Sequence, residues 1–119
     1  IPEPDSALAM ATIAGARLLA PDLVFAELAN ILWKCHRRGL IDAFDPAGYD
    51  FVALFDQVVP CAMLWQPAAA LAVALDHPVY DCFYLALAIA QNDTLITADR
   101  RFHAACAASP HVDRVRLLG

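Results

Sequence analysis

Residues 79–97, VYDCFYLALAIAQNDTLIT, decide the fold, because they predict a buried helix, a turn and a strand in direct succession. The run Val79–Ala90 is apolar around a single charge, Asp81, which is typical of a helix buried on most sides. An Asn-Asp pair then makes a turn into Thr94–Thr97, whose composition is typical of a strand. A buried helix that leads into a strand favours an α/β domain.

The rest of the chain repeats this alternation of strand-like and helical segments. Asp22 is expected to cap a helix that Gly39 ends after a cationic last turn. The expected helices are about 5–14, 22–39, 45–58, 68–76, 79–91 and 99–108, and the expected strands are 17–20, 61–65, 94–97 and 115–118. This pattern predicts one domain over residues 1–119, a three-layer α/β/α sandwich with a mainly parallel sheet and helices on both faces.

Composition narrows the class of protein. Hydrophobic residues make up 61% of the chain and charged residues 18%, which excludes a disordered chain and exceeds what one small core needs. A partner surface or self-association is therefore expected. We expect no membrane span and no secretory signal, and a cytoplasmic location with reduced thiols fits the widely spaced cysteines, which are Cys35, Cys61, Cys82 and Cys106.

Three acids stand in places where a carboxylate needs compensation for burial. Glu27 is the only charge in LVFAELANILW at Leu23–Trp33, Asp81 is the only charge of its run, and Asp99 follows the strand-like Thr94–Thr97. Sites in open α/β sheets form beyond the carboxyl ends of strands, so we expect at least Glu27 and Asp99 at one sheet edge. Clustered carboxylates need a cation between them, and Mg²⁺ or Mn²⁺ suits oxygen ligands. Phosphodiester hydrolysis is the implied reaction.

Each acid also has an ordinary interpretation. Asp81 suits the positive end of a helix, Asp99 could be a plain N-cap, and Glu27 could be buried beside an arginine. Asn30 and Thr97 could hold a metal-bound water or orient a carboxylate, and either could equally satisfy a backbone group. Surface or packing roles are favoured for the histidines, which show no ligand spacing: His36, His77, His103 and His111.

Basic residues are clustered although the net charge is −5. One cluster is Lys34, Arg37 and Arg38, a second is Arg100 and Arg101, directly after Asp99, and Arg114 and Arg116 alternate near the end. Such patches can hold phosphates, although a cationic helix end is more often only solvated. The core or an interface is the expected place of the large aromatic residues Trp33, Trp65, Tyr80 and Tyr84.

Two segments carry a resemblance to a known family. APDLVFAELANILWKCHRRG at Ala20–Gly39 and HPVYDCFYLALAIAQNDTLITADRRF at His77–Phe102 resemble PIN-domain ribonucleases, specifically VapC-type toxins of toxin–antitoxin pairs. The resemblance implies a metal-dependent endoribonuclease that acts as a homodimer, with a cognate antitoxin whose C-terminal segment blocks the acidic pocket. It places the family's second, third and fourth acids on Glu27, Asp81 and Asp99, with Thr97 at a position that often carries a hydroxyl.

The chain departs from that family at its front. The family opens with a central strand that ends in an aspartate, whereas IPEP at Ile1–Pro4 resembles the segment after that strand. We expect a strand and turn upstream of Ile1, since a parallel sheet without its middle strand leaves unpaired backbone groups in the core. The alternatives are a catalytically inactive PIN-like module that binds a protein or RNA, and an acidic-pocket phosphatase of another α/β family.

Overall fold

The strands of the chain are short and pair in parallel. The computed structural model describes residues 17–42 and 44–118. Within these residues β1 (Leu19–Pro21) pairs with β2 (Gln57–Val59), and β3 (Leu95–Thr97) pairs with β4 (Val115–Leu117). Helices connect the strands, which confirms the α/β class and the parallel pairing. The described strands form two separate pairs rather than the single sheet expected of a three-layer sandwich.

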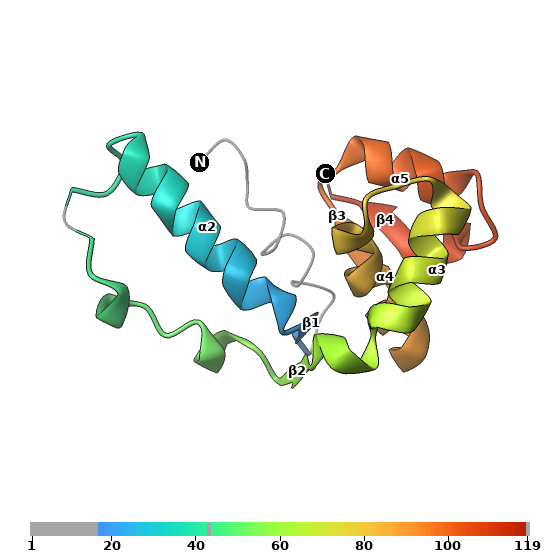
Figure 1. Ribbon diagram of the computed structural model, residues 1–119, viewed down its shortest axis with the longest axis horizontal. Helices are drawn as coiled ribbons and strands as arrows, with labels where there is room; N and C mark the ends of the chain where they lie inside the picture. The colour runs from blue at the N-terminus through green and yellow to red at the C-terminus, as the bar shows by residue number, and fades with distance from the viewer. Residues whose placement is uncertain (1–16, 43, 119) are drawn as a thin grey trace.

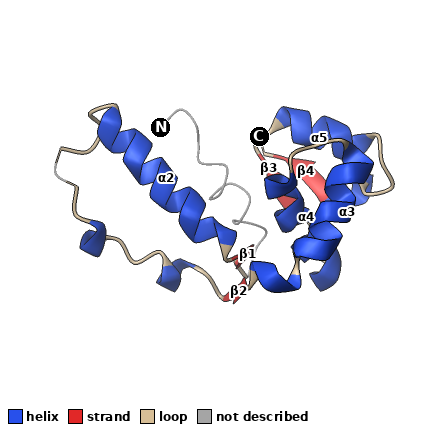
Figure 2. Cartoon of the chain, viewed as in Figure 1, coloured by secondary structure: helices blue, strands red, loops and turns tan. Residues whose placement is uncertain are grey.

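The helices are distributed unevenly over the two strand pairs (Figure 1). Helix α2 (Leu23–Arg37) leads away from the β1–β2 pair, followed by a long irregular segment. The remaining helices gather around β3 and β4: α3 (Trp65–Leu75), α4 (Val79–Gln91) and α5 (Arg100–Ala107) (Figure 2). Helix α4 packs against β1 as well as α3, so it connects the two parts of the molecule.

The core is centred on α4. Its middle is buried on nearly every side, at Cys82, Tyr84, Leu85, Ala86, Leu87 and Ala88. Helix α5 adds Phe102, which has no exposed surface, and β4 adds Val115. An all-round apolar helix needs neighbours on all sides, and α4 has α3 on one side and strands on the other. The apolar run that predicted a buried helix therefore does form the centre of the fold.

A sharp corner separates α3 from α4. Asp76 ends α3 in the left-handed conformation, with φ of 51°, and Pro78 directly precedes α4. Proline restricts the residue before it to extended conformations, so the helix cannot continue through His77. No single helix in residues 17–42 and 44–118 is long and apolar enough to cross a membrane. Helices α3 and α4 taken together have the length and composition of a membrane span, but the pair is bent by 116°.

Two expected elements between α2 and α3 are wrong. The helix predicted for residues 45–58 is replaced by two single 3₁₀ turns, Pro46–Gly48 and Val52–Leu54, and then β2. Phe55 still packs edge-on against Phe25 of α2, with ring centroids 5.9 Å apart, so the apolar stripe contributes to the core without being helical. The sequence pattern could not reveal that pairing with β1 extends the chain here.

The strand predicted for residues 61–65 lies four residues earlier, in β2. Cys61–Met63 is a 3₁₀ turn instead, and Trp65 already begins α3. Asp22 sets this register: its backbone N–H donates to the Val59 carbonyl at 2.9 Å, and its carboxylate accepts from the Cys61 N–H at 2.9 Å. Asp22 does precede α2, but its carboxylate makes no capping bond to that helix, contrary to expectation.

The end of α2 and the cysteines agree with the sequence, whereas the N-terminal segment lies outside the described residues. Gly39 follows α2 with φ of +75°, as expected of the residue that ends a helix. The four cysteines are free, and Cys35, Cys82 and Cys106 are buried, which confirms the expected thiols. The helix expected at about 5–14 lies outside the described residues. The strand expected upstream of Ile1, and the assignment of 1–119 to one domain, stay predictions.

Candidate active site

Asp81 lies in the first turn of α4, as expected, on the rim of the core. Its side chain is 19% exposed. The helix start is fixed by the Asp76–Pro78 corner, so the carboxylate is held by the best-packed helix of the molecule. One of its oxygens, Oδ2, lies 2.8 Å from Nε2 of His77.

Asp99 both caps α5 and faces the site. Its Oδ1 accepts from the backbone N–H groups of Arg101 and Phe102 at 2.9 and 3.0 Å, so the ordinary N-cap interpretation is confirmed. The cap uses one oxygen and leaves Oδ2 for another partner. Thr97, fully buried at the end of β3, accepts from the Asp99 N–H at 3.0 Å and so fixes the turn that carries the acid. Thr97 thus satisfies a backbone group.

His77 has the packing role expected of it, and it also contacts Asp81, which was not expected. It occupies the corner between α3 and α4, and its side chain is 7% exposed. Its ring packs against Phe102, with centroids 4.8 Å apart, while Nε2 meets Asp81. The overlooked signal was the spacing of His77 and Asp81, four residues apart, although the Pro78 corner made a shared helix face hard to foresee.

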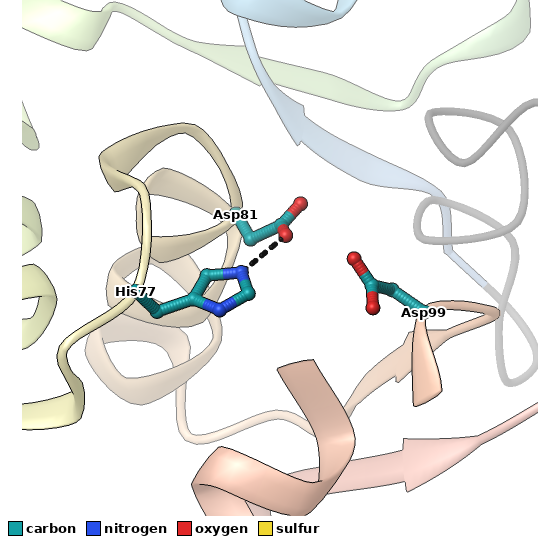
Figure 3. A group of neighbouring side chains, drawn as sticks. All are labelled: His77, Asp81 and Asp99. Atoms are coloured by element: carbon teal, nitrogen blue, oxygen red, sulfur yellow. Dashed lines mark hydrogen bonds and ion pairs between the residues drawn. The ribbon is translucent and has the colours of Figure 1, made fainter. Parts of the chain in front are cut away.

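One ligand atom from each of His77, Asp81 and Asp99 lies within 4.8 Å of the others. Figure 3 shows the three side chains converging from the α3–α4 corner, the start of α4 and the turn after β3. Elements distant in sequence thus bring one nitrogen and two carboxylates to one place. We expected Glu27 and Asp99 to share a sheet edge; the acids that meet directly are Asp81 and Asp99.

Burial and like charge disfavour the ionised form of Asp81. Desolvation raises the pKa of its carboxyl group most, the His77 hydrogen bond lowers it, and the charge of Asp99 raises it further. The net pKa is raised from the ordinary value of 3.8. A cation between Asp81 and Asp99 would reverse this balance, because it would stabilise both carboxylates.

Glu27 borders the same site from α2. Its carboxylate accepts a hydrogen bond from the hydroxyl of Tyr84, which is 3% exposed in the middle of α4. Desolvation raises the pKa of Glu27 most, the Tyr84 hydrogen bond lowers it, and the charge of Asp81 raises it. The partner of Glu27 is therefore a tyrosine rather than the arginine considered from the sequence, and Tyr84 is a second residue that the sequence did not point to.

The basic residues form two groups, one at the start of α5 and one at the end of α2. Arg100 and Arg101 are exposed in the first turn of α5, directly after Asp99. Lys34, Arg37 and Arg38 lie together near the far end of α2, where they line an open depression of about 340 Å³ with Trp33. Asn30 is exposed on α2, one turn after Glu27.

Comparison with protein families gives a decisive match. The family model described as the PIN domain matches residues 2–108, which is most of the chain. The chain belongs to the PIN domain family. PIN domains are generally metal-dependent nucleases, and the acidic cluster at Asp81 and Asp99 fits that chemistry. A comparison with curated proteins gave no significant match.

The donor set of this PIN domain suits a divalent cation. Two carboxylates from rigid positions, with ligand oxygens within 4.8 Å of each other, provide the hard ligands that Mg²⁺ and Mn²⁺ prefer. His77 holds Asp81 in place, as the outer partners of metal ligands commonly do. Glu27, about one helix away, is held by Tyr84 at the border of the same acidic region.

Proposed function

We propose that this PIN domain is an endoribonuclease toxin of the VapC type, which hydrolyses RNA phosphodiester bonds with Mg²⁺ or Mn²⁺. The observation that carries the proposal is the convergence of Asp81 and Asp99 within 4.8 Å, next to His77. Two like charges at a partly buried place need a cation, and a divalent cation also attracts a phosphate. Glu27, Asp81 and Asp99 are the proposed metal-site acids.

Each residue has a distinct part in this proposal. Asp81 and Asp99 hold the cation through carboxylate oxygens, and His77 positions Asp81. Glu27 is the acid on the facing helix, where its raised pKa suits exchange of a proton with water near the phosphate. A bound divalent cation would supply charge neutralisation at the phosphate and activation of water. Asn30, three residues after Glu27 on α2, is proposed to hold a metal-bound water or to orient a carboxylate.

Binding of RNA to an acidic chain requires local positive charge. The net charge of −5 would repel a polyanion over the whole surface. Arg100 and Arg101 start α5 directly beside Asp99, so they can hold the phosphate flanking the scissile bond. The Arg101 backbone N–H donates to Asp99, so the start of this helix is fixed next to the acid. This arrangement favours a phosphodiester over a neutral substrate.

An antitoxin and a second copy of the chain complete the proposal. A lysine or arginine side chain from an antitoxin segment could take the place of the cation between the carboxylates of Asp81 and Asp99. For the homodimer, the supporting observation is that α3 exposes two large apolar side chains, Trp65 at 54% and Val73 at 84%. An apolar depression of about 360 Å³ next to it is lined mainly by Pro67, Ala70, Leu71, Ala74, Ala86 and Ile89. A cytoplasmic location agrees with the free thiols.

Cleavage of RNA by matched variants tests the proposal. Asp81→Asn and Asp99→Asn should each reduce Mn²⁺-dependent cleavage of a single-stranded RNA by at least about 100-fold, the scale of losing one charge-stabilising group. Asp99→Asn is informative because asparagine caps a helix as well as aspartate does, so the fold is retained. Asp113→Asn changes an exposed acid beyond the other end of α5 and should leave cleavage unchanged.

The substrate panel separates the alternatives. RNA, DNA and a small phosphate monoester are compared under identical conditions with wild-type protein and chelator controls. Cleavage of RNA alone, lost in Asp81→Asn, supports the nuclease. Hydrolysis of the monoester alone would indicate a phosphatase, and RNA binding with no cleavage of any substrate would indicate the inactive PIN-like module.

A further inference from the structure

One exposed aromatic side chain lies among the cations at the far end of α2. Trp33 is 51% exposed, although it was expected to pack in the core or an interface. Its neighbours in the sequence include Lys34 and Arg37. Cζ of Arg37 lies 5.1 Å from the centroid of the Trp33 ring, within the range of a cation–π contact. The guanidinium covers one side of the ring, and half of the side chain remains accessible to solvent.

The same four residues form a concave surface rather than a scattered charge. Of the residues that the structure describes, Trp33, Lys34, Arg37 and Arg38 line an open depression of about 340 Å³. Three cations within five residues are unusual in a chain whose net charge is −5. An indole that offers a planar face, with cations around it, matches a base flanked by phosphates, since bases stack on aromatic rings while lysine and arginine hold the backbone.

The position of this surface on α2 connects it with the acids. Glu27, Asn30 and Lys34 follow one another at helical spacings of three and four residues, so they share a face. At 1.5 Å per residue, Trp33 lies about 9 Å and Arg37 about 15 Å along the helix from Glu27. That span is short enough for a few nucleotides of a single strand to cover, since even in a stacked duplex one strand advances about 3.4 Å per nucleotide. The buried face of α2, with Val24, Leu28 and Cys35, is a different one.

We propose that Trp33, Lys34, Arg37 and Arg38 form a binding site for single-stranded RNA, in which one base stacks on Trp33 and the cations hold the neighbouring phosphates. The site lies a few nucleotides from the acids and determines where the strand enters. The inference deepens the proposed nuclease function and rests on it for the identity of the strand. An acidic peptide would satisfy the cations but would leave the indole face without a planar partner.

Binding in the presence of chelator tests this site separately from cleavage. In a Trp65→Phe background Trp33 is the remaining tryptophan, so its fluorescence reports on this surface alone. An eight-nucleotide uridine oligomer should quench that fluorescence and bind saturably. Trp33→Ala, with Trp65 retained, should weaken binding of a fluorophore-labelled oligomer by about 5- to 100-fold, the effect of losing one stacked base.

Two comparisons separate stacking from charge. An abasic oligomer of equal length should bind the wild-type protein more weakly than the uridine oligomer, and Trp33→Ala should remove that preference. Arg38→Ala should reduce the slope of log affinity against log salt by about 0.7, as one fewer phosphate is neutralised. The matched control Arg116→Ala, at an exposed arginine of β4, should leave the slope unchanged.

Binding of RNA, abasic oligomer and poly-glutamate decides whether this surface is a site for single-stranded RNA. Quenching by RNA but not by a poly-glutamate peptide supports the site, even if the chain cleaves no substrate, in which case the nuclease proposal alone fails. Equal binding of RNA and abasic oligomer, or unchanged affinity in Trp33→Ala, overturns it. Saturable quenching by poly-glutamate that RNA cannot displace would also overturn it, because the surface would then serve an acidic protein.

Discussion

Helices α2 and α4 contribute to the same acidic site but differ in how they are held. Helix α4 buries most of its middle, and its acid, Asp81, is fixed by His77. Helix α2 buries three residues and ends in exposed cations. The acid of α2, Glu27, depends on α4 through the hydroxyl of Tyr84.

This difference indicates a division of labour. Groups that must hold a cation need fixed positions, and these come from the packed region with α4 and α5. Groups that hold a long flexible strand can be exposed, because stacking and phosphate contacts tolerate movement of side chains. The comparison therefore predicts that substitutions near α4 affect stability and metal binding, whereas substitutions at the end of α2 affect only binding of RNA.

The largest contrast is expected in the free energy of unfolding. Leu85 of α4 has no exposed surface, so Leu85→Ala should reduce the free energy of unfolding by about 2–5 kcal/mol through lost burial and a cavity. Trp33→Ala at the end of α2 should change it by less than about 0.5 kcal/mol. Urea unfolding followed by circular dichroism measures both. Equal losses would contradict the comparison.

A smaller effect is expected where the two helices touch. Tyr84→Phe removes the hydroxyl that donates to Glu27, and the free energy of unfolding should fall by about 1.5–3 kcal/mol, more than for a neutral pair because the acceptor is a carboxylate. Tyr80→Phe is the matched control, since Tyr80 is 61% exposed on the same helix. If Tyr84→Phe lowered the free energy of unfolding no more than Tyr80→Phe does, the hydrogen bond from α4 to Glu27 would not stabilise the fold.

Some of this arrangement could be predicted from the sequence, and the reasons are local. The run Val79–Ala90 predicted α4 within a residue, because its length and composition leave no other solution. Asp81 and Asp99 could be selected since single acids in apolar or strand-end settings are easy to recognise. The predicted helix at residues 45–58 failed because β2 is formed by pairing with β1, a contact that periodicity does not contain. His77 was overlooked because a corner, rather than a helix face, brings it to Asp81.

The smallest effect is the pH dependence of the metal-free protein. The folded-state pKa of Asp81 is raised, so its contribution to stability is complete below the ordinary value of 3.8 and is lost as pH rises through the folded pKa. In chelator at pH 7, Asp81→Asn should therefore be more stable than wild type, by on the order of 1 kcal/mol or less, the repulsion of unit charges about 4 Å apart in water.

Thermal melts of both proteins from pH 4 to pH 7 measure this difference. The advantage of Asp81→Asn should shrink toward acidic pH, because wild-type Asp81 then becomes protonated. Asp113→Asn serves as control for an exposed acid. If Asp81→Asn were less stable than wild type at pH 7, the Asp81 carboxylate would stabilise the fold through His77 and would not be destabilised by the absence of a cation.

The central claim is that Asp81 and Asp99, with His77 behind them, hold a divalent cation. Titration of the wild-type protein with Mn²⁺ by calorimetry tests it without requiring any activity. We predict saturable binding that Asp81→Asn abolishes, that His77→Gln weakens by about 10- to 100-fold, and that Asp113→Asn leaves unchanged. Equal Mn²⁺ affinity in wild type, Asp81→Asn and His77→Gln would contradict the account.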